Sequence, residues 1–321
     1  MSTITDQTMR AISPTEWGGA EHLAEIRTPR PVASATEILV RVHAAGVNAT
    51  DWKQRVTGGL GLWGDPPILG YDVSGTVEAV GLGVTLFTPG DEVFGMPRFP
   101  QQAGAYAEYV SAPARQFAPK PTVIDHVQAA ALPLAALTAW QALVDTADVQ
   151  PGQRVLVHAA AGGVGHLAVQ IAKARGAEVI GTATGPKHEL LRSLGADRLI
   201  DYTAAPFQDG LTGVDVVLDT IGGEYLARSL DTLRPGGILI CLASPFDPPE
   251  DVAADAARRR IRVAAPLVEP DRLALTAIAA LVQSGALRPF IDTVLPLAQA
   301  RQAHELGESG RTTGKIVLTL G

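Results

Sequence analysis

The fold of this chain is decided by the stretch Val155-Leu156-Val157-His158-Ala159-Ala160-Ala161-Gly162-Gly163-Val164-Gly165. Its first four residues predict a short strand, its glycines a tight turn, and the apolar helix that follows ends at Gly176. This order is typical of a dinucleotide-binding unit. Ala160 replaces the first glycine of the usual fingerprint, while Gly162 and Gly165 allow close backbone approach and helix–strand packing. We expect a pyrophosphate to lie on the N–H groups at the helix N-terminus.

Apolar strands alternate with amphipathic helices from Pro133 onward. Pro186–Leu194 is one such helix, because proline suits a first helical turn and Gly195 suits the stop. The alternation predicts a doubly wound parallel sheet with helices on both faces, which is the Rossmann type of α/β domain. The predicted strands are Arg154–His158, Glu178–Thr184, Asp197–Asp201, Val214–Thr220, Ile238–Ser244 and Ile261–Pro266.

Short strands broken by glycine and proline come before this pattern and predict an antiparallel, barrel-like lobe. The tail returns to strand character after a helix at Asp271–Ser284, and we assign the tail to the barrel-like lobe. The expected lobes are therefore residues 1–128, completed by 288–321, and residues 129–287. The predicted elements of the first lobe are Ile38–Val42, Gly75–Val80, Glu92–Phe94, Tyr106–Val110, Phe290–Leu295, the helix Ala298–Leu306 and Lys315–Leu320.

Length, apolar content and net charge together indicate two lobes and no nucleic-acid partner. A chain of 321 residues that is 46% apolar can form two lobes. The net charge of -7 comes from interspersed acids and bases, with Arg258-Arg259-Arg260 the one notable basic run, so we expect no nucleic-acid partner.

The single cysteine, Cys241, cannot form a disulfide within the chain or a thiolate metal cluster. Met1–Arg10 does not have the character of a secretory signal, and no apolar run reaches the length of a membrane span. We therefore expect a cytoplasmic protein without a membrane partner.

The choice of nicotinamide cofactor depends on the end of the second strand, where an acid would bind the ribose hydroxyls and repel a 2′-phosphate. The residues there are Thr182-Ala183-Thr184-Gly185, and Lys187 follows. Hydroxyl groups and a lysine favour NADPH over NADH. The alternative is that Lys187 is a solvated lysine at the start of a helix.

Six segments carry a resemblance to a known family: Gly46–Asp51, Gly70–Gly75, Gly104–Tyr109, Ala159–Gly165, Leu194–Asp197 and Thr313–Leu318. Together they resemble the medium-chain dehydrogenase/reductase superfamily, and within it the zinc-free quinone oxidoreductase branch that includes zeta-crystallin and plant enone oxidoreductases. The resemblance covers essentially the whole chain. It implies a GroES-like antiparallel β-barrel catalytic domain beside an NADPH-binding Rossmann domain.

The zinc-dependent alcohol dehydrogenases of this superfamily place a cysteine at the position of Asn48, a histidine at that of Tyr71 and a further ligand near Leu134. A catalytic zinc needs three such ligands, and Asp72 alone cannot replace them. We expect no metal.

Without a metal, the acceptor must already be electron-poor, as a quinone or an α,β-unsaturated carbonyl is. The resemblance places Asn48 near the nicotinamide as a hydrogen-bond donor, with turn capping as the alternative role. Lys53 would touch the cofactor or stabilise an oxyanion, unless it is a surface lysine. Tyr71 would donate a proton or hydrogen bond, unless it is a buried tyrosine satisfied by a neighbour.

The resemblance and the strand-end rule for parallel sheets together give a set of expected cofactor contacts. These are Thr138, Ala161, Gly162, Gly163, Val164, Gly165, Thr182, Thr184, Lys187, Tyr202, Ile221, Ala243, Ser244 and Lys315. The loops containing Trp63, Pro66, Pro67 and Met96–Gln102 suit the wall of a substrate cleft, or simple loop packing.

Three questions stay open at this level. Quinone and enone reduction use the same hydride geometry, and an enoyl reductase for carrier-bound thioesters is a further alternative. A non-catalytic NADPH-binding sensor is another. Relatives commonly form homodimers through the strand near Ile261–Pro266, although this edge could equally be covered by its own chain.

Overall fold

The computed structural model describes residues 7–243 and 248–320, which form two compact units. Unit 1 comprises Met1–Leu137, Glu269–Gly285 and Pro289–Gly321, and unit 2 comprises Thr138–Val268 and Ala286–Arg288. Helix α3 (Pro133–Trp140) lies across the division.

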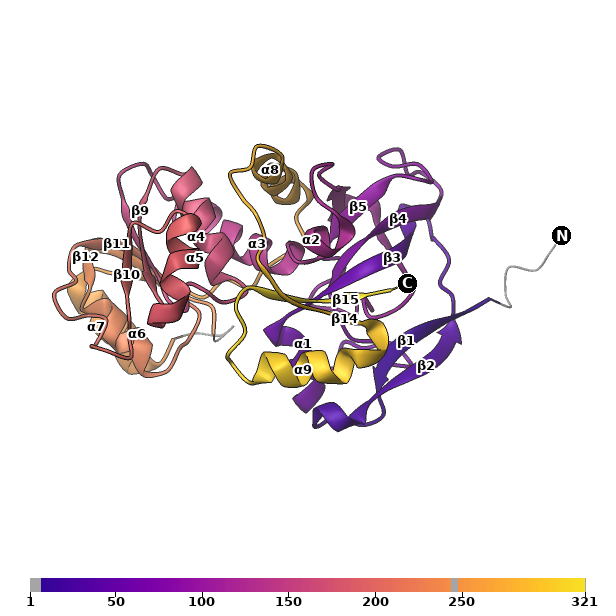
Figure 1. Cartoon of the computed structure of the whole chain (residues 1–321), viewed down its shortest axis with the longest axis horizontal. Helices are drawn as coiled ribbons and strands as arrows, with labels where there is room; N and C mark the ends of the chain where they lie inside the picture. The colour runs from indigo at the N-terminus through magenta and orange to yellow at the C-terminus, as the bar shows by residue number, and fades with distance from the viewer. Residues whose placement is uncertain (1–6, 244–247, 321) are drawn as a thin grey trace. The chain divides into compact units, whose positions relative to one another are not determined.

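The core of unit 2 is a six-stranded parallel sheet in the order β10-β9-β8-β11-β12-β13 (Figure 1). Strand β8, which leads into the glycine turn, lies between β9 and β11 in the interior of the sheet. This arrangement confirms the predicted doubly wound Rossmann sheet. The strands are β8 (Arg154–Val157), β9 (Glu178–Thr182), β10 (Arg198–Ile200), β11 (Val214–Asp219), β12 (Leu233–Cys241) and β13 (Arg262–Ala264).

Helices follow the strands of unit 2 as the alternating pattern predicts. The apolar helix α4 is buried along most of its length, since Leu167, Val169 and Ile171 pack in the interior. A π-helical turn, η4 (Gln141–Thr146), continues α3. The other helices of unit 2 are α4 (Gly165–Ala174), η5 (Gly185–Lys187), α5 (His188–Ser193), α6 (Glu224–Leu230) and α7 (Glu250–Arg259).

The sole thiol of the chain, that of Cys241, lies at the end of β12 within the apolar core of unit 2. Its residue is 2% exposed. Burial, with a smaller contribution from Asp219, raises the pKa of the Cys241 thiol to about 12. The thiol is therefore protonated and shielded from solvent.

Unit 1 is built on a seven-stranded, mostly antiparallel sheet in which β14-β15-β3-β4-β5-β7 follow in order and β6 pairs with β3. A separate two-stranded sheet is formed by β1 and β2. The strands are β1 (Thr8–Pro14), β2 (Leu23–Pro29), β3 (Glu37–Val47), β4 (Asp72–Val80), β5 (Glu92–Gly95), β6 (Tyr109–Pro113), β7 (Phe117–Pro119), β14 (Ile291–Pro296) and β15 (Lys315–Thr319).

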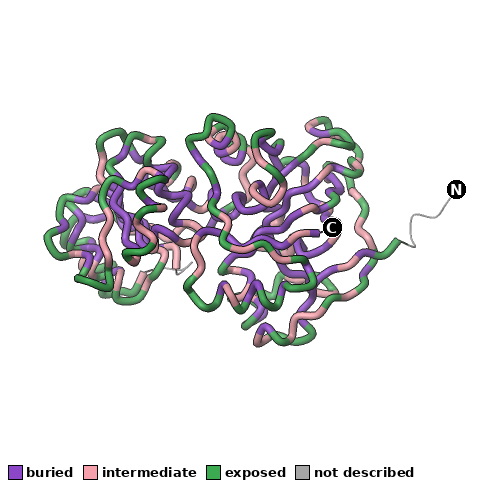
Figure 2. Tube along the Cα trace, in the orientation of Figure 1, coloured by how far each residue is buried: buried purple, intermediate pink, exposed green. Residues whose placement is uncertain are grey.

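The C-terminal tail belongs to this sheet, because β15 pairs antiparallel with β3 (Figure 1). The strand expected at Tyr106–Val110 begins three residues later, at Tyr109, because Tyr106 and Glu108 bond instead to Ile12 and Arg10 of β1. Figure 2 shows buried residues gathered in the interior of each unit and exposed residues mainly on the outside.

The division between the units differs from the expected one at two places. Residues 129–137 and the helix α8 (Arg272–Gln283) belong to unit 1, although the sequence pattern groups them with the cofactor domain. Helix α8 packs against β7 of unit 1, and an amphipathic helix does not reveal in its own sequence which sheet it covers. The other helices of unit 1 are η2 (Ala20–His22), α1 (Ala49–Thr57), η3 (Ala114–Gln116), α2 (His126–Ala130), η6 (Leu297–Gln299) and α9 (Ala300–Glu308).

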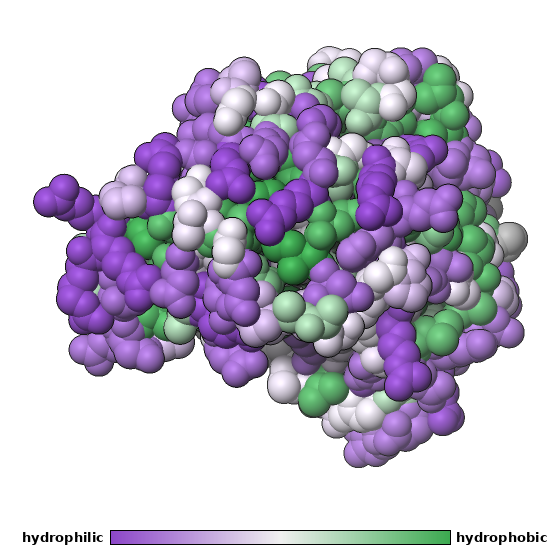
Figure 3. Space-filling model, turned by 60° about the vertical axis from the view of Figure 1, so that its left-hand side comes forward, coloured by the Kyte–Doolittle hydropathy of each residue, from purple (hydrophilic) through white to green (hydrophobic). Residues whose placement is uncertain are grey.

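The surface carries large apolar side chains at separate places, such as Val32, Leu82 and Leu273. On the face drawn in Figure 3, hydrophilic residues predominate and apolar ones show between them. Isolated apolar residues are normal on a protein surface. Among the described residues, no helix has both the length and the apolar character that crossing a bilayer requires.

Candidate active site

The glycine turn of unit 2 connects the end of β8 to the first residue of α4. The backbone N–H groups of Ala161, Gly163 and Val164 have no hydrogen-bond acceptor within the described part of the chain. A Cβ at Gly165 would lie 2.4 Å from the carbonyl oxygen of Ala159, so only glycine lets the helix start so close to the turn. A Cβ at Gly162 would meet only that same oxygen, at 3.2 Å.

These features suit a pyrophosphate. Unsatisfied N–H groups at a helix N-terminus favour an anion, and the missing side chain at Gly162 leaves room beside the backbone. The turn is therefore a chemical fit to a nicotinamide dinucleotide.

A buried polar platform holds the turn in place. Ala159 adopts a left-handed backbone conformation with φ of 45°, which is costly for a residue with a side chain. Its N–H donates to Oγ1 of Thr182 over 3.2 Å, and His158 bridges Thr182 and Ser229 with its two ring nitrogens, at 3.2 and 3.0 Å. Burial, and secondarily Arg228, lowers the pKa of His158 to about 3, so this histidine is neutral. The platform offsets the strain at Ala159.

From the sequence, the Thr182 hydroxyl is expected to contact the cofactor. The structure places that hydroxyl under the turn, fully buried. Its direct contact with a phosphate stays a prediction.

An acid lies near the edge that selects the cofactor. Asp201 comes from the segment after β10, and its carboxylate accepts the N–H of Gly185 over 2.8 Å. Thr203 donates to the other oxygen through its N–H and its hydroxyl, and these bonds lower the pKa of Asp201. The sequence did not point to Asp201 as a residue of the cofactor site, because the rule for the selecting acid concerns only the end of the second strand. Thr184 and Lys187 lie half-buried beside this loop.

The loop after β11 also lies at the C-terminal end of the parallel sheet. Asp219 accepts the N–H groups of Ile221 and Gly222 with one oxygen, at 2.7 and 2.8 Å, and its other oxygen is unpaired among the described residues. The Ile221 side chain is 41% exposed. Of the remaining expected contacts in unit 2, Tyr202 is exposed, Thr138 and Ala243 are half-buried, and Ser244 lies outside the described residues.

Unit 1 contains a buried polar cluster around Asn48, which lies at the N-cap of α1. The Asn48 amide nitrogen Nδ2 donates to Oδ2 of Asp72 over 2.9 Å, and Nζ of Lys315 donates to Oδ1 of Asn48. Lys315 and Asp72 form an ion pair at 3.6 Å in which both side chains are almost fully buried. Burial raises the pKa of Asp72 and lowers that of Lys315, and each charge opposes the shift of the other.

A second chain of buried groups lies next to this cluster. Asp51 accepts the Asn48 N–H over 2.7 Å and the Tyr106 hydroxyl over 3.1 Å. Tyr106 in turn contacts Nε2 of His304 at 3.3 Å, and His304 contacts Arg55 through Nδ1. The structure thus brings together polar and charged side chains that lie far apart in the sequence.

The other two candidate catalytic residues lie in different surroundings. Tyr71 is 1% exposed, and its hydroxyl donates to Oε1 of Gln54 over 2.5 Å. Burial and the nearby Asp51 raise its pKa, so Tyr71 is a neutral hydrogen-bonding group. The Lys53 side chain is exposed on α1. Their catalytic roles stay predictions.

An open cavity of about 350 Å³ lies on the loops of unit 1. Tyr71 is close to the same loops, since its ring meets Phe99 edge-on at 4.9 Å. The cavity is lined by Leu62, Trp63, Gly64, Arg98, Gln101 and Gln102. Trp63 and part of the segment Met96–Gln102 thus border a cavity, whereas Pro66 and Pro67 do not line it. Contact of these loops with a substrate stays a prediction. Among the described residues, no group of three His, Cys, Asp or Glu side chains is arranged to hold a metal.

Comparisons with known proteins cover nearly the whole chain. Residues 34–122 match the alcohol dehydrogenase GroES-like domain, and residues 194–318 match the zinc-binding dehydrogenase family. Human quinone oxidoreductase is 31% identical over 331 residues, which is 97% of this chain and 98% of that protein. A mycobacterial structure complexed with NADPH is 32% identical with a TM-score of 0.86, and the match covers 97% of this chain and 100% of that one.

A component of the pikromycin polyketide synthase of Streptomyces venezuelae is 39% identical over 310 residues, or 92% of this chain. This chain spans only 8% of the length of that relative.

Proposed function

Because the chain belongs to the quinone oxidoreductase branch of the medium-chain dehydrogenase/reductase superfamily, we propose that it is a zinc-independent, NADPH-dependent reductase of quinones or α,β-unsaturated carbonyls. The glycine turn Ala159–Gly165 is the observation that carries this proposal. It combines unsatisfied N–H groups, a helix N-terminus and a gap left by Gly162, and all three suit a dinucleotide. When bound, NADPH supplies the hydride.

The preference for NADPH rests on Lys187 and Thr184, which can contact a 2′-phosphate, and on the likeness to a protein solved with NADPH. Asp201 favours NADH instead, because a carboxylate near this edge of the sheet repels the 2′-phosphate of NADPH. The comparison of NADPH with NADH is therefore part of the test.

Unit 1 supports chemistry without zinc. The positions that would need a cysteine and a histidine hold Asn48 and Tyr71. An amide donor suits an acceptor whose oxygen gains negative charge as the hydride arrives, since it stabilises that charge without a metal. We assign this role to Asn48.

The test is the loss of NADPH absorbance when purified protein is offered a 1,4-naphthoquinone and an aliphatic enone in parallel, with NADH as the alternative donor. Turnover with either acceptor supports the proposal, and the preferred acceptor decides between quinone and enone. Binding of NADPH without turnover of any acceptor contradicts the reductase and favours a sensor.

Substitution at Gly162 provides the control. Alanine at this position adds a carbon 3.2 Å from the Ala159 oxygen, which the turn can accept, whereas leucine fills the space beside the backbone. We expect Gly162→Ala to weaken NADPH binding modestly and Gly162→Leu to abolish it, as measured by NADPH fluorescence. Full turnover in Gly162→Leu would show that the turn is not the cofactor site.

A second candidate is the reduction of enoyl thioesters bound to a carrier protein. The 39% identity with a polyketide synthase component favours it. Turnover of an enoyl thioester far above that of free quinones and enones would select this candidate.

A further inference from the structure

Asn48 is the only asparagine in the 321-residue chain, and its side-chain amide lies between two buried, opposite charges. Asp72 accepts from Nδ2 over 2.9 Å, and the Lys315 ammonium donates to Oδ1. Asn48 itself is 6% exposed.

These partners determine which way the amide points. An ammonium group can only donate hydrogen bonds, and a carboxylate can only accept them. A flipped amide would place its NH₂ group against Lys315 and its oxygen against Asp72, so both contacts would be repulsive. The Lys315–Asp72 pair therefore admits one orientation of Asn48.

The pair is itself fixed on several sides. Lys315 also donates to the carbonyl oxygen of Val47 over 3.0 Å, and the second oxygen of Asp72 accepts the N–H of Leu134 over 2.7 Å. At Gly46, a Cβ would lie 2.7 Å from Oδ2 of Asp72, so the close packing depends on glycine at this position. The whole arrangement lies within unit 1.

We propose that Lys315 and Asp72 are positioning residues that aim and polarise the Asn48 amide as a hydrogen-bond donor to the acceptor oxygen. This inference rests on the proposed reductase function. Donation from Lys315 to Oδ1 draws electron density from the amide and strengthens its remaining N–H as a donor. The gain is largest in the transition state, where the acceptor oxygen carries negative charge. Lys315 thus acts through Asn48.

The first experiment reads the amide directly, without turnover. Protein is labelled with a heavy nitrogen isotope in the asparagine side chain, so that proton–nitrogen NMR correlation spectra contain the signals of Asn48 alone. We expect two separate proton signals, one of them shifted downfield by its bond to Asp72. Lys315→Met should move both signals. Unchanged signals in this variant would overturn the proposal.

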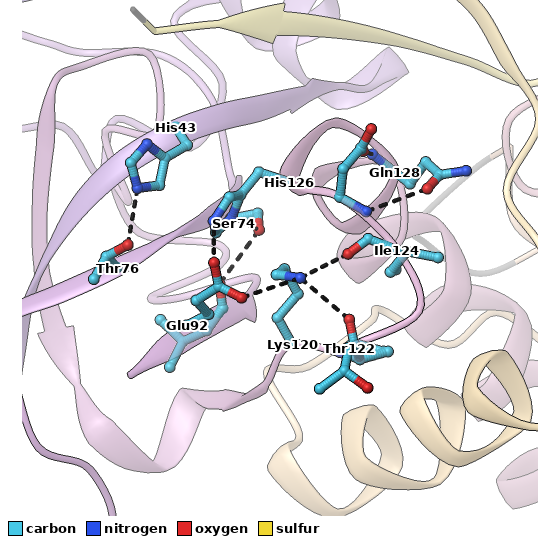
Figure 4. A network of polar contacts seen from close by, with 12 residues as sticks. His43, Ser74, Thr76, Glu92, Lys120, Thr122, Ile124, His126 and Gln128 are labelled. Atoms are coloured by element: carbon cyan, nitrogen blue, oxygen red, sulfur yellow. Dashed lines mark hydrogen bonds and ion pairs between the residues drawn. The ribbon is translucent and has the colours of Figure 1, made fainter. Parts of the chain in front are cut away.

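Lys120 provides the matched control, because it is another buried lysine of unit 1. Its ammonium donates to the carbonyl oxygen of Ile124 over 2.6 Å and lies 3.2 Å from Glu92 (Figure 4), and among the described residues it makes no hydrogen bond to Asn48. We expect Lys120→Met to leave the Asn48 signals in place. If Lys120→Met moves them as far as Lys315→Met does, a general loss of structure explains both, and the proposal fails.

The second experiment is kinetic. Lys315→Met should lower kcat about tenfold with little change in KM, because the loss falls on the transition state. In an Asn48→Ala background the same substitution should lower kcat no further, since the two residues act as one unit. Additive losses, or a rise in KM alone, would contradict positioning through Asn48.

Removal of Lys315 leaves Asp72 as an unpaired buried charge, which can unfold the protein. The doubly neutral variant Asp72→Ser/Lys315→Met avoids this and keeps Asn48 as the only asparagine. It should show a comparable loss of kcat, and both Asn48 signals should move, with the downfield shift caused by Asp72 lost. If the wild type reduces no acceptor, the reductase proposal fails, whereas the NMR spectra still decide whether Lys315 and Asp72 hold Asn48.

Discussion

Asp51 is a fully buried carboxyl group, and one of its oxygens has no hydrogen-bond partner among the described residues. Burial raises its pKa to about 7, Asp72 adds to the shift, and bonds from Asn48 and Tyr106 oppose it. In the unfolded chain the same carboxyl titrates near 3.8. Between these two values the folded state holds a proton that the unfolded state has lost, so a rise in pH destabilises the fold.

The substitution Asp51→Asn mimics the protonated acid and should remove this dependence. One pKa unit corresponds to about 1.4 kcal/mol, so Asp51 should lower the free energy of unfolding of the wild type by roughly 4 kcal/mol from about pH 4 to pH 7. Urea unfolding across this range measures the slope, which should be flatter in the variant. Equal slopes in the two proteins would mean that Asp51 ionises normally in the folded state.

Among the secondary-structure elements, the junction of β8 and α4 depends on the hydroxyl of Thr182 in β9. Thr182→Val keeps the shape of the side chain but leaves the Ala159 N–H and His158 without their partner, which costs about 1–3 kcal/mol. The turn should lose its preorganised form, and we expect roughly tenfold weaker NADPH binding in a fluorescence titration.

Thr232→Val is the matched control for this element. Thr232 is equally buried in unit 2, and its hydroxyl donates to the Ser229 carbonyl rather than to the turn. The Thr232→Val variant should be less stable than the wild type and should bind NADPH with unchanged affinity. Equal weakening in both variants would show that the Thr182 platform has no particular role in the cofactor site.

The elements also show where sequence reasoning succeeds. The strand, turn and helix around Gly162 are local in the sequence, and the parallel sheet follows from the repeated alternation of strands and helices. Strands β1 and β2 were not predicted, because their sequences mix charged and apolar residues without regular alternation. The contact between Asn48 and Lys315 joins residues 267 positions apart, and no local pattern reveals such a pair.

For the whole molecule, β13 is one of the two edge strands of the parallel sheet in unit 2, and β10 is the other, among the described residues. An unpaired edge can continue its sheet in a second copy of the chain. Leu267, which follows this strand, is 47% exposed. We expect a homodimer through this edge, with a mass of twice 33.5 kDa by light scattering.

Leu267→Glu should shift the protein towards the monomer by placing a charge in this interface. Leu82→Glu, at a more exposed leucine of unit 1, should leave the dimer intact. A monomeric wild type would exclude the β13 interface. A dimer whose mass is unchanged by both substitutions would exclude it too.

The burial of Cys241 has a consequence for a protein that handles quinones. Quinones are electrophiles that add to thiolates, and they inactivate proteins whose cysteines are exposed and ionised. Here the only thiol is protonated, with its pKa raised to about 12, and is 2% exposed. The chain therefore offers its proposed substrates no accessible thiolate for covalent addition, and a cysteine introduced on the surface would be the single target of a thiol-reactive label.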